Sequence, residues 1–345
     1  MSESEAPTPP GNHRPKDRLV WPLASLLVLL VSTIVIGGMY LWPFLTRQSS
    51  LPFGYDTPKY VWRANLVADQ GLDALVGATP EGFGANADRP GYPVIAALVR
   101  AVLGVVPFQL AFVLSAVVAV SIGLGAGAFA VRSLGEPLWA FPIYAVVVGA
   151  SVNIARTAVG YADNLIFDAV AVAAALLVIL VVQAEGGMAG GIVLLAGGAL
   201  IHWNFALLFA LMIGAFAVLL LPASFKQWRG GGGVLATPSI RLGMLIGGSA
   251  LAGAGALGLG PSFPYTVPEL PLSIIERKYG EFIKLYRLPI LGGAVAAGLP
   301  ALWWPRSQTR RRAFLLVLLW AGLGVAGIVA LRVLHMAVPA YRFLG

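Results

Sequence analysis

The chain contains no cysteine, and charged residues are scarce in it. The lack of cysteine excludes disulfide bonds and thiolate metal sites. Asp, Glu, Lys and Arg make up 11% of the 345 residues, against 58% for hydrophobic residues, and the mean hydropathy is +0.83. A soluble domain of this size does not need so much apolar surface, so the composition predicts an integral membrane protein.

Motifs typical of soluble enzymes are also missing. The sequence has no phosphate-binding P-loop, no Gly-x-Ser-x-Gly and no His-Glu-x-x-His. It has no internal repeat either, which gives no support to a transporter built from inverted repeats. The net charge of +8 is spread over many loops, which indicates a preference for anionic lipid and not a nucleic-acid-binding patch.

Apolar runs of bilayer length predict an all-α polytopic membrane protein with about nine transmembrane helices. The predicted spans are about 19–45, 108–131, 138–155, 164–183, 188–204, 206–221, 240–260, 288–304 and 313–334. The two runs 188–204 and 206–221 are either two short helices that meet at His202-Trp203-Asn204 or one broken helix.

The rest of the chain divides around these spans. Residues 1–18 are polar and rich in proline, which predicts a disordered cytoplasmic tail before a single transmembrane domain, 19–345. The first span is too long for a signal-peptide core and lacks an Ala-x-Ala-like exit, so it should stay uncleaved. Two outer loops should carry interfacial helices: 46–107, with a juxtamembrane helix over Tyr92–Val106, and 261–287, with an amphipathic helix over Ser273–Arg287.

Basic residues in short loops predict the orientation of the chain. Lys226 and Arg229 mark one loop, and Arg310-Arg311-Arg312 mark another. With nine spans, these loops and the N-terminal tail lie on one side, the cytoplasm. The remaining polar clusters then face outward, where separate loops can build one site.

Several short motifs resemble the GT-C superfamily of glycosyltransferases that use polyprenyl-phosphate donors. The motifs are Gly54-Tyr55-Asp56 after the first span, Asp88-Arg89-Pro90-Gly91-Tyr92-Pro93, the turn Arg156–Asn164, His202-Trp203 and Tyr341-Arg342-Phe343. The resemblance implies a GT-C-like fold with its site at the outer face and inversion at the anomeric carbon. The chain departs from the family because it has no Asp-x-Asp, Thr57 follows Asp56 where one branch has an Asp-Glu pair, and relatives continue beyond the point that corresponds to Gly345.

Glycosyl transfer needs a carboxylate that takes a proton from the acceptor hydroxyl. By the resemblance, Asp56 is the candidate general base; the alternative is a helix N-cap before Pro58. Asp88 and Asp163 are candidates for a second acid or an acceptor-binding group. Their alternatives are a salt bridge to Arg89 and an N-cap, respectively.

The transfer also needs groups that hold the departing phosphate. The candidates are Arg342, His202, Arg332, His335 and Arg156, with headgroup contact or interfacial anchoring as the alternative role. Asp168 lies about one turn inside the membrane, where a carboxylate is usually paired or functional, so it is a candidate cavity acid.

The sequence therefore predicts a glycosyltransferase of the bacterial inner (plasma) membrane whose site faces the periplasm or the extracellular side. Its expected partners are a polyprenyl-phosphate-linked sugar, a glycan, glycolipid or protein acceptor, and membrane lipid, without nucleic acid. No metal or other cofactor is predicted, because the carboxylates Asp56, Asp88 and Asp163 would meet only if the loops fold together; a divalent cation stays open as an alternative. A lipid or solute transporter or flippase and a non-catalytic membrane subunit of the same fold are the other readings.

Overall fold

A computed structural model describes residues 15–47, 57–71, 74, 90–151, 162–258 and 307–334, and every regular element in these ranges is helical. The elements are α1 (Pro15–Arg47), α2 (Thr57–Gln70), α3 (Gly91–Leu103), α4 (Pro107–Arg132), η2 (Leu138–Ala140), α5 (Phe141–Ser151), α7 (Ala162–Gln183), α8 (Met188–Leu219), α9 (Leu221–Arg229), η3 (Val234–Ala236), α10 (Pro238–Gly258) and α13 (Gln308–Leu334). The predicted all-α class is confirmed for this part of the chain. The predicted span 288–304 and the amphipathic segment Ser273–Arg287 lie outside it.

Three of the described helices are long and apolar enough to cross a membrane, over Leu23–Trp42, Val113–Arg132 and Leu165–Gln183. A fourth crossing results if Ala206–Leu219 and the helix bent away from it, Leu221–Arg229, count as one span. The nine predicted spans therefore remain a prediction, and the membrane character rests on these three or four.

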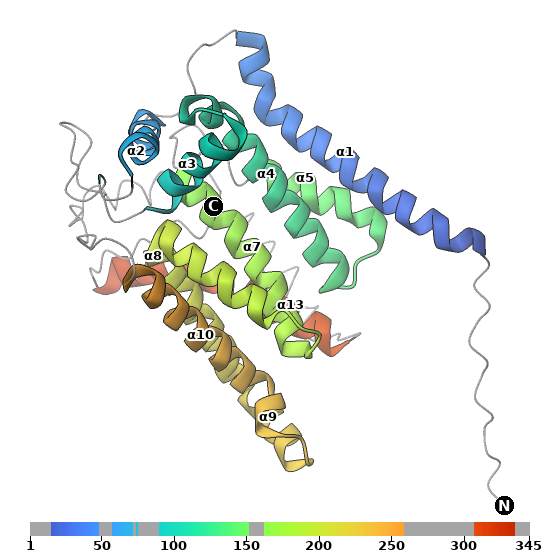
Figure 1. Ribbon diagram of the computed structural model, residues 1–345. Helices are drawn as coiled ribbons and strands as arrows, with labels where there is room; N and C mark the ends of the chain where they lie inside the picture. The colour runs from blue at the N-terminus through green and yellow to red at the C-terminus, as the bar shows by residue number, and fades with distance from the viewer. Residues whose placement is uncertain are drawn as a thin grey trace, which may run out of the picture.

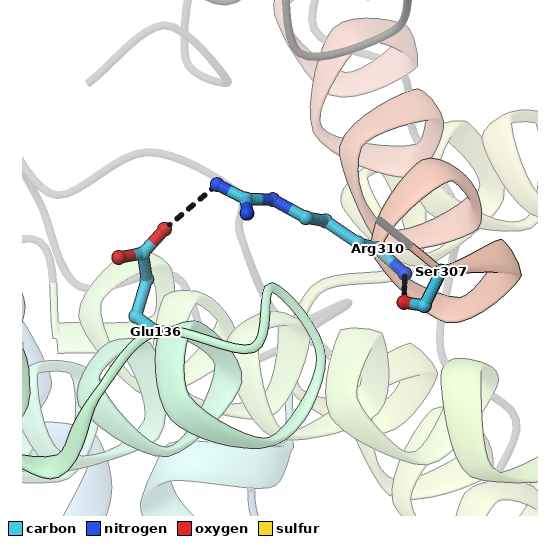
Figure 2. Close-up of polar contacts among 3 residues, drawn as sticks. All are labelled: Glu136, Ser307 and Arg310. Carbon is cyan, nitrogen blue, oxygen red and sulfur yellow. Dashed lines mark hydrogen bonds and ion pairs between the residues drawn. The ribbon is translucent and has the colours of Figure 1, made fainter. Parts of the chain in front are cut away.

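The two ends of the helix bundle are defined by contacts between helix termini. At one end, Arg310 near the start of α13 forms an ion pair of 3.1 Å with Glu136, which follows α4 (Figure 2). Beside it, the Gln183 side chain at the end of α7 donates a hydrogen bond of 2.5 Å to Thr309. We call this the Glu136 end. The start of α7 marks the opposite end, which we call the Asp163 end, where α2 and α3 also lie.

Helix α1 lies along α4 and α5 at one side of the bundle (Figure 1). The Tyr40 hydroxyl donates a buried hydrogen bond of 3.0 Å to the carbonyl of Gly149, which fixes α1 against α5. The helix begins at Pro15, within the segment 1–18 for which the sequence predicts a disordered tail. Proline suits the first turn of a helix, where its missing N–H is not needed.

The predicted juxtamembrane helix over Tyr92–Val106 is present as α3, shifted by a few residues. Gly104 ends it in the left-handed conformation, at φ +69°, and its N–H bonds to the carbonyl of Arg100. Pro107 then begins α4, where Gln109 accepts a hydrogen bond from the Val106 N–H. These end signals explain why the chain changes direction within three residues.

Helix α8 contains a break and reverses its direction there. His202 has φ −154° and ψ 83°, which is not helical. The first arm starts four residues after α7, at the Glu136 end. The second arm returns to the same end, as two hydrogen bonds show. Near the end of this arm, the carbonyl of Ala217 accepts a hydrogen bond from the Ser239 hydroxyl. Two residues after Ser239, the Arg241 guanidinium donates a hydrogen bond to the carbonyl of Val181, which lies near the end of α7. His202 therefore lies at the turn between the two arms. Of the two predicted alternatives, two short helices or one broken helix, the structure favours two short helices.

Candidate functional site

Helix α2 carries an unusual buried polar face. Lys59 and Arg63 are four residues apart, hence on one side of the helix, and only 7% and 3% of their surfaces are exposed. Thr57 is buried beside them. Burying a cation is expensive unless other groups compensate it. This burial sets α2 apart from a solvated loop helix and indicates a built polar interior.

Helix α7 supplies the acid that faces this helix. Asp163 stands in the first turn of α7 with 1% of its surface exposed, and the Tyr60 hydroxyl of α2 donates a hydrogen bond to its Oδ1. A carboxylate is favoured in the first turn because the N–H groups of a helix start attract negative charge. The hydrogen bond holds Asp163 in one orientation and joins α2 to α7 at the Asp163 end.

Helix α3 completes the aromatic wall of the site. Tyr92 is almost fully buried and meets Tyr60 edge to face, with 5.3 Å between ring centroids and an interplanar angle of 83°. Burial raises the pKa of Tyr92 to about 12, so its hydroxyl stays protonated at neutral pH. Gly91 permits a close approach, since a Cβ on it would lie 2.6 Å from the Cα of Ile201 in α8.

The break in α8 brings His202 to the same end. Its side chain is 1% exposed, and its ring lies 6.4 Å from the ring of Phe167. Phe167 follows Asp163 by four residues, so both lie on one face of α7, about one turn apart. His202 and Asp163, predicted as site residues from separate motifs, therefore both lie at the Asp163 end. Together with Lys59, Tyr60 and Arg63 of α2, they form the set of buried polar residues at this end that we call the cluster.

The cluster encloses little space in this conformation. A cavity of about 20 Å³ lies between α2, α3, α4 and α7, lined by Thr57, Tyr60, Tyr92, Ala111, Leu114, Ser115, Ala162 and Leu165. A cavity of this size holds one water molecule and no sugar ring. A larger ligand does not fit this cavity in the described conformation.

The other predicted site residues are distributed as follows. Asp168 lies on α7, half-buried and one turn below Asp163. Arg332 is placed by its backbone in the last turn of α13. Asp56, Asp88, Arg156, His335 and Arg342 lie outside the described residues, so their roles stay predictions.

Lys59, Tyr60, Arg63 and Tyr92 are site residues to which the sequence motifs assign no role. The signal for the two cations is their spacing of four on a helix that starts at Thr57, but the spacing does not reveal that this face is buried. Tyr60 is a site residue because of its hydrogen bond to Asp163. The two residues are 103 positions apart in the chain, so the sequence alone does not reveal this contact.

A second hollow, of about 380 Å³, lies at the Glu136 end between α4, α7 and α13. Its wall includes Arg132 and Glu185, both exposed, and the ion pair in Figure 2 lies beside it. Opposite charges in contact with water need no ligand to balance them. The Asp163 end is the better candidate site because its charged groups are withdrawn from water.

No protein-family model, curated protein or solved structure matches the chain. The likeness to GT-C glycosyltransferases therefore rests on the sequence motifs, and the site rests on its own geometry.

The cluster combines groups suited to a polar ligand with an anionic part. Lys59 and Arg63 can bind phosphate oxygens, and a guanidinium can contact two of them at once. Asp163, held by Tyr60, can accept a hydrogen bond from a ligand hydroxyl. Among the described residues, no group of three or more His, Asp or Glu side chains could hold a metal ion.

Proposed function

We propose that the chain is a membrane glycosyltransferase that transfers a sugar from a polyprenyl-phosphate donor to a cell-envelope acceptor. The observation that supports the proposal is the burial of four polar side chains at the Asp163 end: Lys59 and Arg63 on α2, Asp163 on α7 and His202 in α8. A lipid-linked sugar needs a polar pocket at the rim of an apolar bundle, so that its tail stays in lipid while its phosphate meets cations.

In this proposal, Lys59 and Arg63 bind the donor phosphate and stabilise the charge that develops as it leaves. His202, beside Phe167 one turn further along α7, assists this binding. Asp163 orients the acceptor hydroxyl, while Asp56, one residue before α2, is the general base that the family resemblance suggests. The described residues among them, Lys59, Arg63, Asp163 and His202, lie at the Asp163 end.

The proposed site must open for the reaction. A sugar does not fit the present cavity of about 20 Å³. The contact between Tyr60 and Asp163 is a polar link between α2 and α7, so donor binding would exchange this hydrogen bond for contacts to the ligand. The sugar would then lie between the two helices.

A transporter is the second candidate, and the break in α8 is the observation that favours it, since many transporters bind substrates at broken helices. In such helices, however, the two halves continue across the membrane. Here the second arm returns to the end where the first began, which puts His202 at the rim of the bundle. The rim position favours an enzyme that acts at one face.

The test uses the purified full chain in lipid nanodiscs with radiolabelled polyprenyl-phosphate sugars. Arg63→Gln should raise the KM for the donor about tenfold or more, the usual effect of losing a hydrogen bond to a charged group. Arg63→Lys keeps the charge and controls for folding. Arg100→Gln is the matched control, because Arg100 is exposed and pairs with Asp69 at 2.7 Å on the same side of the bundle.

Asp56→Asn and Asp163→Asn separate the two acids. Loss of a general base lowers kcat by about 10² to 10⁴ with donor binding intact, which we expect for Asp56→Asn. Asp163→Asn should instead raise the KM for the acceptor. If folded wild-type protein binds none of the donors but moves a solute across vesicles, the transporter replaces the enzyme.

A further inference from the structure

Helix α9 carries an exposed apolar stripe at the Glu136 end. Leu221, Phe225 and Trp228 follow each other at helical spacing, and about half of each side chain is exposed: 52%, 48% and 51%. Figure 1 shows α9 at the tip of the pair formed by α8 and α10, away from α2 and α3. Large side chains so exposed on a short helix indicate a surface that is covered in the native setting.

The turn after α9 extends the stripe. Val234 and Leu235 of η3 are 50% and 69% exposed. The side chain of Gln227 donates a hydrogen bond of 3.5 Å to the carbonyl of Ala236, which holds η3 beside α9. The apolar groups of the two elements therefore form one surface, which we call the α9 patch.

Positive charge flanks the α9 patch, and the neighbouring stretch of sequence contains no acid. Lys226 and Arg229 lie in the last turn of α9, and the Arg229 guanidinium stacks 4.4 Å above the ring of Phe225. The sequence has no Asp or Glu between Glu185 and Glu269, so neither α8 nor α10, which pack against α9, brings an acid to it. The partner of this surface is therefore expected to be anionic.

The α9 patch is also held at a fixed angle. Helix α9 bends 47° away from the preceding arm of α8. The buried Ser224 hydroxyl contacts Ser239 at 2.9 Å and accepts a hydrogen bond from its N–H at 3.1 Å. Ser239 in turn bonds the carbonyl of Ala217 at 2.8 Å. These bonds orient the exposed stripe outward.

We propose that α9 and η3 form an interfacial anchor that binds the anionic phospholipid surface of the leaflet at the Glu136 end. The apolar stripe would enter the boundary between headgroups and acyl chains, and Lys226 and Arg229 would contact lipid phosphates. A flat lipid surface fits better than a protein groove because the stripe is short, convex and cationic on its flank. The anchor stands apart from the proposed reaction, whose residues lie at the opposite end.

The absence of cysteine allows a clean test in the full chain. A single spin label is attached at Phe225→Cys, Trp228→Cys or Ala223→Cys, the last being the control because Ala223 is exposed on another face of α9. The chain is reconstituted in vesicles of phosphatidylcholine alone or of equal parts phosphatidylcholine and phosphatidylglycerol. Collision rates with oxygen and with a water-soluble nickel complex then report the depth of each label.

The proposal expects oxygen-dominated relaxation at positions 225 and 228 and nickel-dominated relaxation at 223, with the first two labels deeper in the anionic vesicles. Nickel-dominated relaxation at all three positions would overturn it. Spin–spin coupling between labels at position 225 in different copies would also overturn it, in favour of a protein dimer.

The charged arm of the test uses Lys226→Gln with Arg229→Gln, read out by the label at position 228. The amount of phosphatidylglycerol needed to reach half of the depth change should rise by roughly fivefold per cation removed. Arg100→Gln, at the other end, should leave that amount unchanged. An unchanged requirement in the double variant would show that the cations do not bind the lipid surface, and would refute the anionic part of the anchor.

Discussion

A methyl group added at Gly91 tests whether the close contact between α3 and α8 shapes the candidate site. The Cβ of Gly91→Ala would lie 2.6 Å from the Cα of Ile201 and 2.9 Å from its N. Ordinary contact begins at 3.4 Å, so the two backbones must separate by about 0.8 Å, the difference between 3.4 and 2.6 Å. Backbone atoms cannot rotate away as a side chain can.

The expected cost follows from overpacking, which destabilises cores by about 1–3 kcal/mol. Gly91 is the first residue of α3, where alanine gains little helix propensity to offset this cost. The displacement also moves Tyr92 relative to Tyr60 and Ile201 relative to the helix break that follows it. We therefore expect Gly91→Ala to lower both the thermal unfolding temperature and the affinity for a lipid-linked sugar.

The assay follows thermal unfolding of the detergent-solubilised chain by tryptophan fluorescence and donor binding by filtration. Gly247→Ala is the matched control, because Gly247 is exposed on α10 and a Cβ added there would meet no atom within 4 Å. This control should be neutral or gain up to about 1 kcal/mol of stability. If Gly91→Ala unfolds at the wild-type temperature while the control behaves as expected, the close approach of α3 and α8 is refuted.

Three further outcomes are expected. Tyr60→Phe removes the hydroxyl that donates a hydrogen bond to the buried Asp163 carboxylate, which should lower the free energy of unfolding by about 1.5–3 kcal/mol. The same substitution should cost less in a chain that already carries Asp163→Asn. Equal losses with and without Asp163→Asn, measured by chemical unfolding, would contradict the hydrogen bond. Glu136→Gln breaks the half-buried ion pair with Arg310 and should lower the free energy of unfolding by at most about 1 kcal/mol, and by less in high salt. If the decrease in unfolding temperature is the same at low and high salt, the pair makes no ionic contribution. Because the folded chain raises the pKa of Tyr92 from 10.0 to about 12, the unfolded chain loses this proton first, so the stability contributed by Tyr92 is complete below pH 10 and decreases as the pH rises to 12. Tyr92→Phe should show a shallower loss of stability over that window, and parallel curves for the two proteins would rule out this linkage.

The sequence predicted the long helices well because a bilayer imposes a minimum length on apolar runs. The run 108–131 corresponds to α4 (Pro107–Arg132), and 164–183 corresponds to α7 (Ala162–Gln183). Helix α9 was not predicted: its apolar stripe covers only nine residues and merges with the end of the preceding run. A short amphipathic helix has too few turns for its pattern of apolar and polar residues to be recognised in the sequence.

The candidate site was predicted in part. Asp163 and His202 were found because polar residues interrupt apolar runs there. Lys59 and Arg63 stand out in the sequence as two bases after the first span, but the sequence assigns them no role. It does not reveal their burial, which results from the packing of α2 against its neighbours α3 and α4. The reversal at His202 was left open between two readings because no glycine or proline marks it.

The reversal in α8 has a consequence for the bilayer itself. At 1.5 Å per residue, the arms Met188–His202 and Ala206–Leu219 are each only about 21–22 Å long. A hydrocarbon layer is about 30 Å thick, so arms of this length that cross it would require the adjacent lipids to compress or lean inward. Such local thinning would bring the water boundary closer to His202, and the polyprenyl-phosphate donor proposed above would meet the polar cluster with its phosphate still in the headgroup layer.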